Sequence, residues 1–152
     1  MNGDVIPDQH NVARYCGPQH VDDGLILGSA FLLKENEDSG LSVNWLEMLA
    51  CNNRHREIAE LRKIYDVKAL GVGQKARRDA KIVVMNVGEA RQKVLESEAR
   101  RSLSVLHHPL IDDPSHSGIH NLRPHNEMIA EIILKQSEKL TPARSRQKKP
   151  VK

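Results

Sequence analysis

The chain has 152 residues, the usual length of one globular domain, and only 3% of them are aromatic, so the core must be mainly aliphatic. No stretch comes near the roughly 18 consecutive apolar residues of a membrane helix, and residues 1–10 are polar and acidic, unlike a signal peptide. The formal net charge is +3, but residues 141–152 hold five of the 23 basic residues and no acid, so residues 1–140 carry 18 bases against 20 acids, about −2. We therefore expect a cytoplasmic protein with no membrane association and a basic C-terminal end.

The first two predicted elements are strands. Residues 11–16 carry β-branched and aromatic side chains and end at a Gly-Pro turn, which is typical of a short strand. Residues 25–33 form an apolar run of strand length, in which Gly28 indicates a bulge or a close backbone contact.

Two helices are expected to follow. Asn44 is predicted to be the N-cap of the first helix, because Glu47 lies three residues later, as in a capping box, and apolar residues surround it. Asparagines at residues 52–53 are expected to break or recap this helix. Apolar residues at helical spacing then predict a second helix that ends near Tyr65.

The second half of the chain predicts alternating strands and helices. We expect strands at residues 67–72, 81–87 and 103–110, a polar loop at residues 112–120, and helices at residues 88–101 and 124–140. In the first of these helices, Ala90, Val94 and Leu95 should face inward, and in the second Met128, Ile129, Ile132 and Ile133 should lie on the buried side.

This order of elements favours an α+β fold. It does not show strict βαβ alternation, so we expect a single compact domain over residues 1–140, with a mixed or antiparallel sheet and helices packed mainly on one face. Residues 141–152 are expected to form a basic, disordered C-terminal tail, because such a segment cannot bury enough apolar surface to fold alone.

The basic tail has two interpretations. It is either a solvated end or an arm that contacts nucleic acid or another acidic partner, in which case its affinity should fall steeply with salt. The candidate contact residues are Arg144, Arg146, Lys148 and Lys149.

The two cysteines suggest neither a disulfide framework nor a redox motif, because Cys16 and Cys51 lie far apart without a CxxC pair. Each is nevertheless followed four residues later by a histidine, His20 and His55. A Cys2His2 zinc site made of these four residues is therefore one hypothesis, although the spacing lacks the tight pair of most structural zinc sites. The alternative is two ordinary cysteines beside surface histidines, with no cofactor.

Aspartates, serines and histidines are concentrated in the sequence DDPSHSGIH at residues 112–120, and two further histidines, His107 and His108, precede it. Histidine pairs act as general acid and base near neutral pH, an aspartate can orient an imidazole, and arginine or tyrosine can bind a phosphate. The candidate catalytic residues are His107, His108, His116 and His120, with Asp112 or Asp113 to orient an imidazole, and Arg14 with Tyr15, or Arg123, to bind a phosphate. The alternatives are a polar turn, for which Asp, Pro and Ser are well suited, and a metal site.

Three functional hypotheses follow from these observations. The first is a non-catalytic subunit or regulator that docks on a larger protein or nucleoprotein assembly, and it requires no complete active site. The second is a metal-independent nuclease, or a related phosphoryl-transfer enzyme, that uses the histidines of residues 107–120. The third is a zinc-stabilised binding module. We favour the first hypothesis and expect no obligatory cofactor.

Overall fold

The centre of the molecule is an antiparallel β-sheet. The computed structural model describes residues 3–23, 25–32, 40–68, 80–122, 126–136 and 141–142. Its sheet has the strand order β6-β7-β4-β1-β5-β8, and every pair in it is antiparallel. These strands are β1 (Asn11–Cys16), β4 (Leu41–Trp45), β5 (Lys81–Asn86), β6 (Ser104–His107), β7 (His116–His120) and β8 (Thr141–Pro142). A separate two-stranded ribbon pairs β2 (Val21–Asp22) with β3 (Leu25–Ile26).

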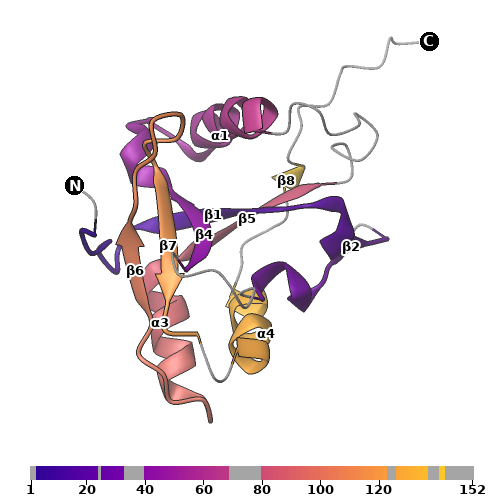
Figure 1. The fold of residues 1–152 in the computed structure, drawn as a ribbon, viewed down its shortest axis with the longest axis vertical. Coiled ribbons are helices and arrows are strands. Elements are labelled where there is room, and N and C mark those ends of the chain that lie inside the picture. The colour runs from indigo at the N-terminus through magenta and orange to yellow at the C-terminus, as the bar shows by residue number, and fades with distance from the viewer. Residues whose placement is uncertain are drawn as a thin grey trace.

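Helices cover both faces of the sheet unequally. The described α-helices are α1 (Arg54–Lys68), α3 (Val87–Glu96) and α4 (Asn126–Gln136), and the short 3-10 helices are η1 (Pro18–His20), η2 (Gly28–Phe31) and η3 (Leu46–Leu49). Figure 1 shows α1 on one side of the sheet and α3 and α4 on the other. The structure thus confirms the α+β fold with helices mainly on one face.

Each face of the sheet has its own hydrophobic core. In β5, Val83 and Met85 belong to the larger core on the α3/α4 face, whereas Ile82 and Val84 belong to the smaller core beneath α1. A strand that is buried on both faces must be apolar at every position, and this is why β5 has an uninterrupted apolar sequence. Helix α3 begins directly after it, and the Asn86 side chain caps α3 by accepting a hydrogen bond of 2.9 Å from the Glu89 amide.

Two predicted elements were wrong in the first half of the chain. Asn44 does not cap a helix; it lies within β4 and is 4% exposed, and η3 follows instead of an α-helix. Its side chain forms buried hydrogen bonds to residues far away in sequence, and such partners override a local capping pattern. The apolar run at residues 25–33 contains only the two residues of β3 and then turns into η2, because Ala30 and Phe31 are buried on the side of α4.

The second half also differs in its details. Residues 112–120 are not a loop throughout, because His116–His120 forms β7, which pairs with both β4 and β6. Leu95 is 55% exposed rather than inward, since α3 turns Val87, Ala90 and Val94 into the core, and Met128 of α4 is 39% exposed rather than buried. Of the strand predicted at residues 67–72, the first two residues belong to α1, and residues 69–72 lie outside the described residues.

The boundary of the predicted tail also shifts. Thr141 and Pro142 pair with Ile82 and Lys81 of β5, so the sheet reaches into the segment that we assigned to the tail. Residues 143–152, including Arg144, Arg146, Lys148 and Lys149, lie outside the described residues.

Candidate functional site

The candidate site is built on the β6–β7 hairpin. Its strands are in register, with Leu106 opposite Gly118 and His107 opposite Ser117. Beyond β6 the pairing continues, because the His108 amide donates to the His116 carbonyl over 2.8 Å. At the tip, Leu110 and Asp113 exchange two backbone hydrogen bonds of 3.0 and 3.1 Å. The tip is therefore an ordered turn rather than an open loop.

A buried polar network fixes the base of this turn. Asp113 is 0% exposed, and its two carboxylate oxygens accept hydrogen bonds of 2.8 and 2.9 Å from the Asn44 amide. The Ser115 hydroxyl donates to the same carboxylate over 3.0 Å. On α1, the Tyr65 hydroxyl donates to Asn44 Oδ1 over 2.7 Å, which completes a link from the turn through β4 to the helix.

The surroundings of Tyr65 keep its hydroxyl protonated. Burial raises the pKa of the Tyr65 hydroxyl far above its ordinary value, and the nearby Asp113 charge raises it further. The hydroxyl therefore remains a hydrogen-bond donor at all physiological pH values. The bonds of the Asp113 carboxylate to Asn44 and Ser115 give this residue a structural role in the network.

Three histidines gather on one face of the hairpin. His116 and His120 are four residues apart in β7, so both side chains lie on the same face of the sheet. His108 lies opposite His116 and reaches His120, and the Nε2 atoms of His108 and His120 are 2.8 Å apart. His116 is held by its own contacts, with Nδ1 2.9 Å from the His108 carbonyl and Nε2 3.3 Å from the Ser42 hydroxyl. We call His108, His116 and His120 the histidine face.

Two residues of the histidine face, His108 and His120, have lowered pKa values. Partial burial lowers the pKa of His108, and the neighbouring His116 and His107 lower it further. The pKa of His120 is lowered by burial and then by His108. These imidazoles are therefore available as nitrogen ligands or proton acceptors near neutral pH.

The structure does not bring all the predicted catalytic residues together. His107 points to the opposite face, where it is 4% exposed, packs edge-on against Trp45 and places Nε2 2.7 Å from the Pro114 carbonyl. Arg14 also points away, and its guanidinium donates to the carbonyls of Ala30 and Ser42.

Tyr15 lies on the same face as the histidines but packs against α1. Its ring centroid is 5.0 Å from that of Tyr65, and it borders the smaller core. Of the predicted catalytic residues, His116, His120 and Tyr15 therefore lie on this face, and the Asp113 carboxylate is also on this side, bonded to Asn44, the residue opposite His116 in β4. Residues 116–120 were predicted as a loop, and it is their strand conformation that places His116 and His120 on one face beside His108.

The four predicted zinc ligands are also separated. Cys16 is buried in the core on the α3/α4 face, whereas Cys51 lies just before α1 on the other face. His20 contacts the Ser29 hydroxyl at 3.0 Å, and His55 is exposed on α1. Within the described parts of the chain, no three His, Cys, Asp or Glu side chains form a group that could hold a metal ion.

The two thiols should differ strongly in reactivity. Burial raises the pKa of Cys16 to about 12, and the thiolate is the reactive form. We expect a thiol reagent at about pH 8 to modify Cys51 rapidly and to modify Cys16 only after denaturation. Mass spectrometry of the labelled peptides would measure this order. Equal labelling of the two cysteines in the folded protein would contradict the buried position of Cys16.

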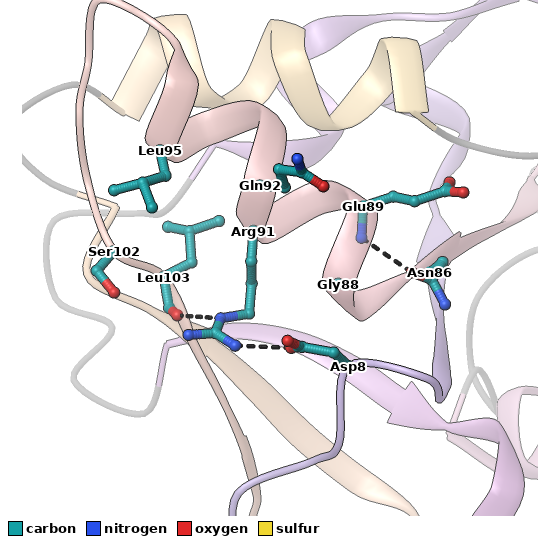
Figure 2. A pocket seen from close by; sticks show the side chains of 9 residues that line it. All are labelled: Asp8, Asn86, Gly88, Glu89, Arg91, Gln92, Leu95, Ser102 and Leu103. Carbon is teal, nitrogen blue, oxygen red and sulfur yellow. Dashed lines mark hydrogen bonds and ion pairs between the residues drawn. The ribbon is translucent and has the colours of Figure 1, made fainter.

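A pocket of about 530 Å³ lies elsewhere, at the N-terminus of α3 (Figure 2). Arg91 crosses it and pairs with Asp8 at 2.6 Å, while its Nε donates to the Leu103 carbonyl over 2.9 Å. Gly88 is required at the pocket wall, because a Cβ there would come within 2.9 Å of the Asp8 backbone oxygen. The Arg91 charge is thus already paired with Asp8. None of the residues that line this pocket belongs to the histidine face.

Comparison with known proteins adds no information on function. Neither family models, nor curated proteins, nor solved structures give a match to this chain. None of the helices in the described residues is long and apolar enough to span a membrane. The function must therefore be argued from the surface and the histidine face alone.

Proposed function

We propose that this protein is a non-catalytic subunit that docks on a partner protein through the tip of its β6–β7 hairpin. The observation that carries the proposal is the full exposure of Ile111 at the end of an ordered turn. Its neighbour Leu110 is 45% exposed. Single exposed apolar residues are common on protein surfaces, but two in succession on a fixed protrusion form a preorganised apolar contact.

The rigidity of the turn supports this function. Asp113 holds the tip from within, through backbone bonds to Leu110 and side-chain bonds to Asn44. A preformed contact loses little conformational entropy on association, so more of the buried apolar surface contributes to affinity. Asp112, next to Ile111, disfavours insertion into an anionic membrane, and we therefore assign the apolar tip to a protein pocket rather than to lipid.

The arrangement of the predicted catalytic residues also favours docking over a metal-independent nuclease. Such an enzyme needs a cation that binds phosphate beside its histidines. Arg14, the first candidate, donates to backbone carbonyls on the other side of the sheet, and Arg123 lies outside the described residues.

The test is the assembly state of the protein in its native cell. We expect the tagged chain to purify gently in a defined heavier assembly that survives nuclease, and we expect the double variant Leu110→Ser, Ile111→Ser to purify as the bare chain. Because both side chains are exposed, the double variant should unfold with a free energy within about 1 kcal/mol of the parent. Native mass spectrometry would measure the two masses.

Leu95→Ser is the matched control, because Leu95 is 55% exposed on α3. This variant should keep the heavier assembly. An assembly that is retained by the hairpin variant, or a parent protein that purifies only as a bare chain, would contradict the proposal. Recovery of the parent on vesicles rather than in a protein assembly would instead assign the tip to lipid and would also overturn it.

A further inference from the structure

We propose that His108 and His120 form a binding site for a divalent first-row transition-metal ion, with Zn²⁺ as the probe ion. This inference is independent of the docking function, because it concerns the sheet face of the hairpin rather than its tip. It also differs from the site predicted at Cys16 and Cys51, since it uses no thiolate.

The first support is the position of the two ring nitrogens. The Nε2 atoms face each other at 2.8 Å, and the ring planes are nearly perpendicular, at 83°. At this separation one neutral ring donates an N–H hydrogen bond to the other, and a metal ion can take the place of that hydrogen between the two nitrogens. Two imidazole ligands of a tetrahedral zinc ion have nitrogens roughly 3.3 Å apart, so small ring rotations would admit the ion.

The second support is the rigid frame around the pair. The backbone hydrogen bond between His108 and His116 fixes the strand that carries one ligand. On the other side, Gly40 lies against the His120 ring, where a Cβ would come within 3.0 Å of Cε1. Preorganised ligands bind a metal ion with less loss of conformational freedom, and such supporting contacts usually contribute to metal affinity.

The third support is chemical. Imidazole nitrogen is a preferred ligand of zinc, nickel and copper ions. Both residues are partly exposed, so an ion can enter and water can complete its coordination. Because the chain offers two ligands at this place within its described residues, the ion would be exchangeable rather than structural.

The test is binding of Zn²⁺ alone to the full chain after removal of metal with a chelator. Equilibrium dialysis should show a single saturable zinc ion per chain. We expect this binding to be lost in His108→Ala and in His120→Ala and to be retained in His55→Ala, which removes an exposed histidine of α1. Circular dichroism would verify the fold of each variant. If only one of the two variants, His108→Ala or His120→Ala, is folded, that variant is sufficient for the test.

Replacement of zinc by Co²⁺ provides a readout that needs no variant. The expected absorption spectrum has ligand-field bands of nitrogen and oxygen ligands without a thiolate charge-transfer band. A thiolate band would place the metal at Cys16 or Cys51 and would overturn the proposal. The absence of saturable zinc binding to the parent, or its retention in a folded His120→Ala variant, would overturn it as well.

Discussion

Asp113→Ala should lower the free energy of unfolding by about 3 kcal/mol, because the variant loses several hydrogen bonds to a buried charged carboxylate. The substitution removes the acceptor of the Asn44 amide and of the Ser115 hydroxyl, at a site that is 0% exposed. A buried donor without an acceptor has lost its bonds to water and gained none from the protein, which is why the effect is large.

Urea unfolding followed by circular dichroism would measure this change as a lower transition midpoint with an unchanged slope. Asp112→Ala is the control, because Asp112 is the exposed neighbour and should change the unfolding free energy by less than about 0.5 kcal/mol. Similar stability of the two variants would show that the network around Asn44 does not hold the turn.

Phe31→Ala should lower the free energy of unfolding by about 3 to 5 kcal/mol, as for other large-to-small changes of a buried aromatic residue. Phe31 is the single phenylalanine of the chain, it is 0% exposed, and it belongs to the larger core on the α3/α4 face. The short η2 helix packs against α4, so the cavity would lie between these two elements. Neither η2 nor α4 can move in to fill this cavity without also displacing the core residues that pack on the sheet.

Leu27→Ala is the matched control for this experiment, because Leu27 belongs to the same apolar run but is 41% exposed. Its loss should cost about 1 kcal/mol or less. Thermal and urea unfolding would compare the two variants. Equal losses of stability in the two variants would contradict the structure, in which η2 buries Phe31 and leaves Leu27 partly exposed.

Periodicity predicted the elements whose structure is set by local patterns. The apolar run of β5 and the spacing of Ile58 and Leu61 on α1 were correctly interpreted, since burial of a strand on two faces, or of a helix on one, leaves a regular pattern in the sequence. The α+β class followed from the order of these elements.

Local patterns failed where distant partners decide the conformation. Asn44 has the neighbours of an N-cap, yet Asp113, 69 residues away, keeps it in a strand. The histidines of residues 116–120 look like part of a polar loop because Gly118 and Ser117 interrupt the apolar alternation. Their pairing with β4 and β6 supplies the strand that local propensity does not.

The sequence by itself determined the fold class, the three described α-helices, the strands β1, β5 and β6, and the presence of an unusual number of histidines near the β6–β7 hairpin. Only the tertiary structure decided which of them meet. It separated His107 and Arg14 from His116, joined His108 to His120 and exposed Ile111. The physical reason is that strand register sets which side chains share a face, and register depends on contacts across the sheet that no local segment contains.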